Sequence, residues 1–96
     1  MDHWRYYIQG RLLEAIRRRD AAIAAYRTAL ASKADFHRCT NRIAYLLASM
    51  ERYGEAVEQF QAVLRLDPQN AVVHFNLGFA LEKLGRHEEA VAAFRE

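Results

Sequence analysis

The sequence is poor in residues that cross-link or interrupt a chain. It has one cysteine, one proline and four glycines among 96 residues. The lone cysteine, Cys39, excludes an internal disulfide, so nothing points to an oxidising compartment. No run approaches the roughly 18 apolar residues of a membrane span, and the first residues do not resemble a signal peptide. We therefore expect a cytoplasmic protein with no membrane role.

Neither sign of charge predominates over the whole chain, because the formal net charge is only +2. Residues 1–48 carry nine Lys or Arg and four Asp or Glu, a net charge of +5. Residues 49–96 carry five Lys or Arg and eight Asp or Glu, a net charge of −3. We expect a basic end and an acidic end. The net charge is too small to predict nucleic-acid binding, and the sequence has no nucleic-acid recognition motif.

What the chain does have is an internal period of about 34 residues. Small, branched apolar and aromatic residues each recur at this spacing. The five columns are Gly10, Ala44 and Gly78; Leu13, Leu47 and Leu81; Ala22, Ala56 and Ala90; Ile23, Val57 and Val91; and Tyr26, Phe60 and Phe94. A period of this length and content is typical of stacked helical hairpins.

Apolar spacing within each period predicts two helices. The six predicted helices cover about 3–17, 21–33, 37–50, 55–66, 71–84 and from about 86 to the end. We expect Ile16, Leu66 and Leu84 to face inward with the other apolar residues of their helices.

Five residues mark the predicted boundaries of these helices. Asp20 and Asn70 are expected N-caps, and Gly54 is expected in a turn. Pro68 stops the fourth helix, since proline cannot continue the backbone ladder. Gly85 suits a left-handed C-terminal cap.

These residues resemble the tetratricopeptide repeat (TPR) pattern. The third copy is clearest, with Asn76-Leu77-Gly78-Phe79-Ala80-Leu81 followed by Leu84-Gly85-Arg86-His87-Glu88-Glu89-Ala90-Val91 and Phe94. The second copy closes with Leu64-Arg65-Leu66-Asp67-Pro68. The resemblance implies an all-α chain, a right-handed α-solenoid of antiparallel helix hairpins with about three units and six helices. Residues 1–96 then form one domain, with repeats at about 3–36, 37–70 and 71–96.

The copies depart from the family pattern at several positions. The first copy has Ala34 for the closing proline and Gln9 for a leucine, and the second has Ala44 for glycine and Glu51 at the turn glycine. The third copy stops before its second helix is complete. Because terminal repeats usually need a polar cap, we expect either a fragment of a longer protein, the favoured interpretation, or an edge covered by another copy.

In the TPR family the first helix of each hairpin lines a concave groove that holds partners. The resemblance places the following candidate binding residues there: Tyr7, Arg11, Arg38, Asn41, Arg42, Tyr45, Phe75, Asn76 and Phe79, with Trp4, Ile8, Ser49, Val72 and Lys83 beside them. Aromatic and arginine side chains are enriched at binding hot spots. We predict a protein or peptide partner that is apolar with acidic residues; the alternative is that some rings only cover the next hairpin.

Some TPR domains hold the acidic tail of chaperones with a carboxylate clamp. The corresponding positions here are Tyr7, Arg11, Arg42, Val72 and Asn76, and the lysines are missing. We therefore do not expect a chaperone-tail clamp.

Other functions have little support in the sequence. Arg17-Arg18-Arg19 is expected to be a solvated turn. The four histidines and Cys39 lack metal-ligand spacing, and no nucleophile with a base or phosphate loop is present. We expect no enzyme activity, no metal and no cofactor. Two alternatives to peptide capture stay open: self-assembly, as a homo-oligomer through the uncapped C-terminal repeat, and an adaptor domain of a larger enzyme.

Overall fold

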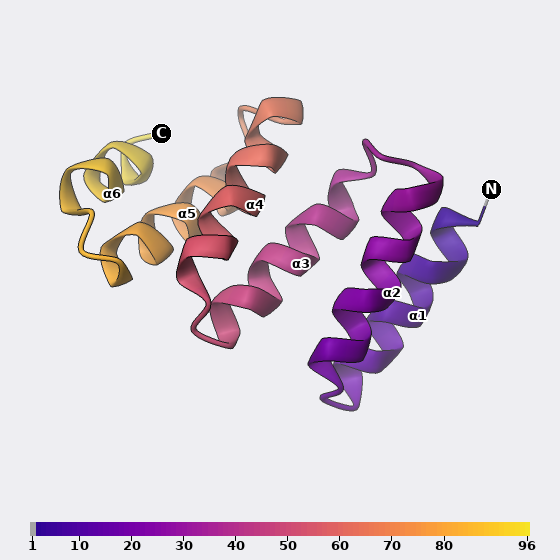
Figure 1. Ribbon diagram of the computed structural model, residues 1–96. Coiled ribbons are helices and arrows are strands. Elements are labelled where there is room, and N and C mark those ends of the chain that lie inside the picture. Colours follow the sequence, from indigo (N-terminus) through magenta and orange to yellow (C-terminus); the bar gives the residue numbers. More distant parts are fainter. Residues whose placement is uncertain (1) are drawn as a thin grey trace.

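The computed structural model describes residues 2–96. Within them the backbone forms six helices and no strand (Figure 1). The helices are α1 (His3–Ala15), α2 (Arg19–Ser32), α3 (His37–Ser49), α4 (Tyr53–Leu66), α5 (Ala71–Lys83) and α6 (His87–Phe94). The prediction of an all-α chain with six helices and a short last helix is confirmed.

Short turns make each helix pack against the next one along the chain. Helices α1 and α2, α3 and α4, and α5 and α6 form three hairpins. Contacts of α2 with α3 and of α4 with α5 join each hairpin to the next, and α3 also touches α5. The result is an elongated row of hairpins with the two ends of the chain at opposite ends of the row (Figure 1).

Two boundary residues act as predicted. Helix α4 ends at Leu66, two residues before Pro68. The side-chain oxygen of Asn70 accepts a hydrogen bond of 3.1 Å from the backbone N–H of Val73 and so caps α5.

Two other boundary predictions are wrong. Asp20 is not an N-cap, because α2 begins at Arg19 and Asp20 lies in its first turn. There its charge still favours the positive end of the helix dipole. Gly54 lies inside α4 rather than in the turn, because the helix begins one residue earlier, at Tyr53. The turn itself is made at Glu51.

The three hairpin turns share one backbone conformation. Arg17, Glu51 and Gly85 occupy the same position of successive repeats and have φ angles of 62°, 61° and 79°. In each turn the next residue donates its backbone N–H to a carbonyl five residues back, as in the bond of 2.8 Å from Arg52 to Leu47. The left-handed prediction for Gly85 is confirmed. Arg17 and Glu51 adopt the same conformation with a Cβ atom, which is sterically unfavourable.

The core lies between the helices along the whole row. Its largest fully buried side chains are Tyr26, Ile43, Leu47, Phe60, Val63, Val73 and Cys39. The predicted inward positions of Ile16, Leu66 and Leu84 are wrong, because all three are exposed. Each lies at the last residue of its helix or just beyond it, where no neighbouring helix covers the side chain.

Glycine in the first helix of a hairpin admits an aromatic ring from the second. A Cβ atom on Gly78 would lie 2.6 Å from a ring carbon of Phe94, and one on Gly10 would overlap the ring of Tyr26. Tyr26 is fully buried and its hydroxyl donates a hydrogen bond to Glu14, so the ring has little freedom to move.

We expect Glu51→Gly to raise the free energy of unfolding by about 1 kcal/mol, because glycine adopts the left-handed conformation without steric cost. Urea unfolding followed by circular dichroism measures this. Gly85→Ala is the matched control and should have the opposite sign; a loss of stability in Glu51→Gly would contradict the prediction.

We expect Gly10→Ala to lower the free energy of unfolding by about 1–3 kcal/mol, because the new methyl group overlaps the Tyr26 ring. Gly54→Ala is the control, since no atom lies within 4 Å of its Cβ position. It should instead raise stability by about 0.5–1 kcal/mol through helix propensity. The same urea titrations test both, and equal effects at the two sites would refute the steric argument.

Candidate functional site

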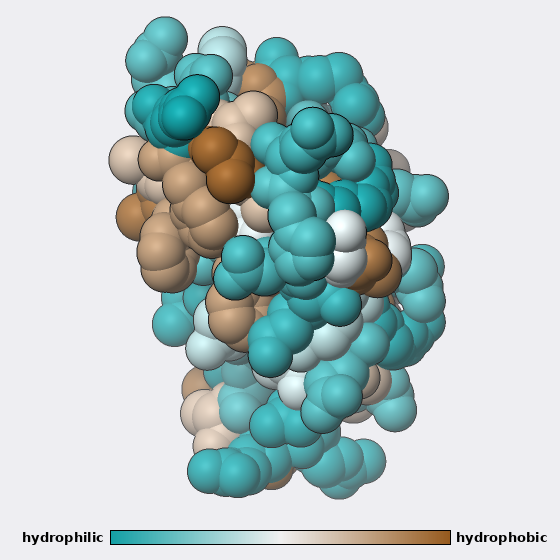
Figure 2. Space-filling model, turned by 90° about the vertical axis from the view of Figure 1, so that its left-hand side faces the viewer, coloured by the Kyte–Doolittle hydropathy of each residue, from teal (hydrophilic) through white to brown (hydrophobic). Residues whose placement is uncertain are grey.

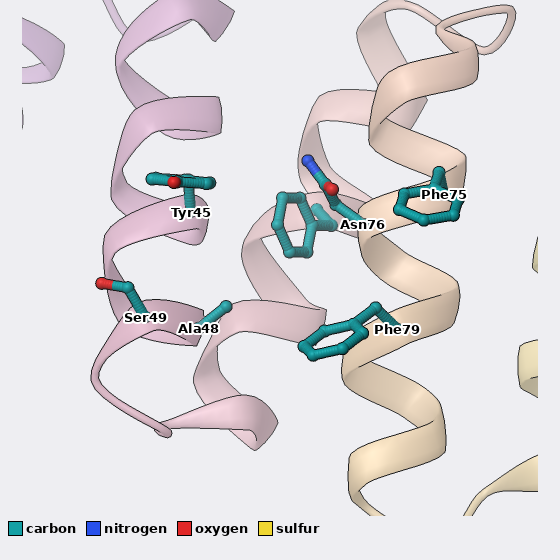
Figure 3. A pocket seen from close by; sticks show the side chains of 7 residues that line it. Tyr45, Ala48, Ser49, Phe75, Asn76 and Phe79 are labelled. Carbon is teal, nitrogen blue, oxygen red and sulfur yellow. The ribbon is translucent and has the colours of Figure 1, made fainter.

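A cleft opens between α3 and α5 (Figure 3), and Phe60 of α4 also lines it. It has a volume of about 300 Å³ and is lined by Tyr45, Ala48, Ser49, Phe60, Phe75, Asn76 and Phe79. In Figure 3, Asn76 and Phe79 point from α5 toward α3, and Phe60 is fully buried. This volume is at the lower end for ligand pockets, so the cleft suits one bulky side chain.

Three aromatic rings around the cleft are exposed to solvent. Tyr45 is 49%, Phe75 61% and Phe79 45% exposed. The Phe79 ring lies 6.3 Å from the ring of Tyr53, and the ammonium of Lys83 lies 5.4 Å from its centre. Rings gathered on one exposed surface usually mark a contact site.

Two polar side chains line the cleft, and they differ in whether they already have a hydrogen-bond partner. The hydroxyl of Ser49 donates to the carbonyl of Leu46 at 2.7 Å and is satisfied. The half-buried carboxamide of Asn76 makes no side-chain hydrogen bond to other residues within 2–96. A carboxamide both donates and accepts, which matches the two groups of an extended peptide backbone.

The N-terminal part of the same side holds a cluster of rings that contact one another. The buried ring of Phe36 lies 4.9 Å from Trp4 and 5.5 Å from Tyr7. The guanidinium of Arg38 lies 5.5 Å from the Trp4 ring centre, and Arg11 donates to the Tyr7 hydroxyl at 3.3 Å. Tyr7 therefore packs inside the first hairpin more than it faces a partner.

A polar network joins the first hairpin to α3. Arg42 donates to both carboxylate oxygens of Glu14, through Nε at 3.1 Å and through Nη2. Tyr26 donates its hydroxyl to the same carboxylate. The Arg42 guanidinium also lies 4.9 Å from the ring centre of Tyr45. The network thus connects α1, α2 and α3 and holds one wall of the cleft.

The network shifts the pKa of each member. Burial alone would raise the pKa of Glu14, but the hydrogen bonds from Arg42 and Tyr26 outweigh it and hold that pKa below its ordinary value. The hydrogen bond to Glu14 raises the pKa of Arg42. Burial, and then the bond to Glu14, raise the pKa of Tyr26. Glu14 and Arg42 are therefore both charged at neutral pH, and the charge of Arg42 is already neutralised.

The structure divides the nine candidate residues into two groups. Tyr45, Phe75, Asn76 and Phe79 meet around the cleft. The other five lie on the N-terminal side: Tyr7, Arg11, Arg38, Asn41 and Arg42. Of these, Arg11 and Arg38 are exposed and Asn41 is half-buried.

Two residues on the side formed by α1, α3 and α5 were not predicted from the sequence. Phe36 forms the centre of the N-terminal ring cluster, although it stands in the loop before α3. Glu14 neutralises Arg42, which belongs to a different hairpin. The helical spacing of Glu14 with Arg11 was the one available signal.

Two family models match this chain. The model described as "TPR repeat" matches residues 44–85, and the one described as "Tetratricopeptide repeat" matches residues 5–36. The two matches do not overlap, and together they cover well over half of the chain. The chain belongs to the tetratricopeptide repeat family. TPR arrays generally serve as protein–protein interaction modules, and the family is typically not enzymatic.

Solved structures confirm the TPR fold. A crystal structure of MamA superposes with a TM-score of 0.93 at 26% identity and covers 97% of this chain. This chain spans about half of that one, 54%. The second TPR of Spaghetti (RPAP3), bound to the HSP90 peptide SRMEEVD, has a TM-score of 0.93 at 19% identity, covering 99% of this chain and 88% of that one. No curated protein matches the chain in sequence.

The residues of this TPR chain that could bind a metal or act as a nucleophile are dispersed over the part of the chain that the structure describes. Within residues 2–96, no three His, Cys, Asp or Glu side chains come together as a metal site would require. Cys39 is buried, and burial raises the pKa of its thiol to about 11. None of the helices formed by residues 2–96 is long and apolar enough to span a membrane.

We expect Glu14→Gln to lower the free energy of unfolding at pH 7 by about 1–3 kcal/mol, because Arg42 loses its partner charge. The pKa of Glu14 is lowered on folding, so its stabilisation is present above about pH 4.5 and is lost as pH falls through the folded pKa. The difference between wild type and variant should therefore shrink below about pH 4. Urea unfolding at several pH values measures this.

Glu55→Gln is the control for this prediction. Its ion pair with Arg52 has an N–O distance of 2.8 Å and is exposed, so its loss should cost less than about 1 kcal/mol. A Glu14→Gln difference that stays constant down to about pH 3 would contradict the assigned linkage.

Proposed function

We propose that this chain captures a short segment of another protein on the side formed by α1, α3 and α5. A bulky apolar side chain of the segment enters the cleft between α3 and α5. The supporting observation is that Tyr45, Phe75 and Phe79 stay exposed around an apolar cavity. Asn76 is available beside them to hydrogen-bond the backbone of the bound segment.

Cations on the side formed by α1, α3 and α5 favour acidic residues in the partner. Arg11, Arg38 and Lys83 are all exposed and none forms an ion pair within residues 2–96. Arg42 is different, because Glu14 already neutralises it. The proposed segment therefore has an apolar anchor with acidic residues on either side of it.

The RPAP3 structure holds an acidic peptide, SRMEEVD, and this provides a useful contrast. Of the five positions where a carboxylate clamp would stand here, Tyr7 packs in the ring cluster and Arg42 is paired with Glu14. Val72 offers no charge. We propose that affinity in this chain comes mainly from the apolar anchor and not from a terminal carboxylate.

The test begins with peptides selected from a random library on the wild-type chain. Their dissociation constants are then measured by fluorescence anisotropy, with SRMEEVD as a comparison peptide. We expect Phe79→Ala to weaken the selected peptides at least about 10-fold, because a central aromatic contact is lost. Circular dichroism establishes that each variant is folded.

Leu66→Ala is the matched control, because Leu66 is an exposed apolar residue at the end of α4 and does not line the cleft. It should leave the dissociation constants unchanged. Equal loss in Leu66→Ala and Phe79→Ala, or no loss in Phe79→Ala, would rule out the cleft. Binding of SRMEEVD as tight as that of the selected peptides would rule out the dominance of the apolar anchor.

A further inference from the structure

Lys83 is an unpaired cation beside the cleft between α3 and α5. Its ammonium lies 5.4 Å from the centre of the Phe79 ring, which lines the cleft. The side chain is exposed and forms no ion pair within residues 2–96. Attraction between the ammonium and the face of the ring favours this position over free movement in water. An occupant of the cleft that touches Phe79 therefore meets a positive charge at its edge.

Lys83 stands on the side of α5 that faces α3. It comes seven residues after Asn76, close to two helical turns, and four residues after Phe79. Residues at these spacings share one face of a helix. Asn76 and Phe79 both point from α5 toward α3 (Figure 3). Lys83 therefore belongs to the internal junction between these two helices.

The arginines of α3 do not provide a comparable charge at the cleft. Arg42 lies over the ring of Tyr45, but Glu14 already neutralises it. Arg38 precedes Tyr45 by seven residues, about 10.5 Å along the helix axis. Its guanidinium lies 5.5 Å from the ring centre of Trp4, on α1. Free positive charge at the cleft is thus greatest on the flank toward the C-terminal end of α5.

The opposite flank of the cleft along α5 is apolar. Val72 precedes Phe79 by seven residues and is 65% exposed. Figure 2 looks on to the end of the row that holds α5 and α6, and hydrophobic patches there lie directly beside hydrophilic side chains. Such a surface matches a segment in which an apolar anchor has a charged residue close to it on one side.

We propose that Lys83 determines the sequence specificity of the cleft by pairing with an acidic side chain two residues from the apolar anchor of the bound segment. The proposal rests on the proposed function and adds to it the position of the charge relative to the anchor. Glu82 does not satisfy Lys83 in place of the segment. As the adjacent residue it projects about 100° away around α5, and no ion pair joins the two.

The geometry of the helices sets this spacing. Lys83 is four residues beyond Phe79, which is about 6 Å along α5. In an extended segment, alternate side chains face the same way and lie about 6.6 Å apart. The segment lies along α3 and α5, which run in the same direction (Figure 1). The anchor and the residue two positions away then both face the cleft, and the residue between them faces solvent.

The test uses a peptide selected on the wild-type chain, with each of its Asp and Glu residues replaced by glutamine. Alanine scanning first locates its apolar anchor. One glutamate is then placed at each position on either side of the anchor in turn, and dissociation constants are measured by fluorescence anisotropy. We expect glutamate two residues from the anchor, on one side only, to tighten binding about 3- to 5-fold, the effect of one exposed ion pair. Added salt should reduce this preference.

Variants at Lys83 connect the preference to its ammonium. Lys83→Gln should abolish the positional preference, and Lys83→Glu should prefer lysine at the same position of the peptide. Lys83→Arg should keep the preference for glutamate. Arg27→Gln is the matched control, because it removes an exposed and unpaired cation from α2 and should keep the preference. Circular dichroism establishes that each variant is folded.

Three results would overturn the proposal. The first is equal binding of glutamate at all positions of the peptide. The second is a preference that is strongest at another position. The third is a preference that persists in Lys83→Gln, which would leave Lys83 only a role in stabilising the C-terminal end of α5. In all three, loss of binding in Phe79→Ala would still support the proposed function. If Phe79→Ala leaves the binding of the peptide unchanged, the cleft is not the site and both proposals fail.

Discussion

The contact between an aromatic ring and a small residue in the facing helix is the constraint on which this array depends. Tyr26 lies against Gly10 and Phe94 against Gly78, at distances that leave no room for a methyl group. This contact sets how closely the two helices of a hairpin approach. Because the Tyr26 ring is also part of the continuous core, the closure of the first hairpin and its stacking on the second rely on the same side chain. The small and aromatic residues that recur every repeat in the sequence are the ones that make this contact.

The sequence predicts the repeat well because each column obeys a local steric rule. Asn70, Pro68 and Gly85 have the structural roles that their chemistry suggests. The wrong assignments, Asp20 as a cap and Ile16 as core, concern helix ends, where small shifts of a boundary change a residue's surroundings. Neighbours contributed by other hairpins determine those surroundings, and periodicity within one helix does not contain them.

The candidate site was predicted in part, for a related reason. The TPR resemblance puts Tyr45, Phe75, Asn76 and Phe79 on one side, and in the structure these four residues line one cleft. The sequence does not indicate which polar groups are already paired with other residues of the chain. Arg42 looks available in the sequence, but Glu14 binds it from another hairpin. Such long-range pairs decide which side chains are left for a partner, and they can be identified only once the hairpins are stacked.

The carboxylate of Glu14 has a further consequence for the internal mechanics of the array. Of the ion pairs within residues 2–96, the one between Glu14 and Arg42 alone connects two hairpins. The junction of α4 with α5 depends on apolar contacts. In a linear array whose stability is a sum of units and junctions, the two junctions then respond to different solvent conditions. Acid therefore weakens an ion pair that only the first junction has, whereas conditions that weaken apolar contacts act on both junctions.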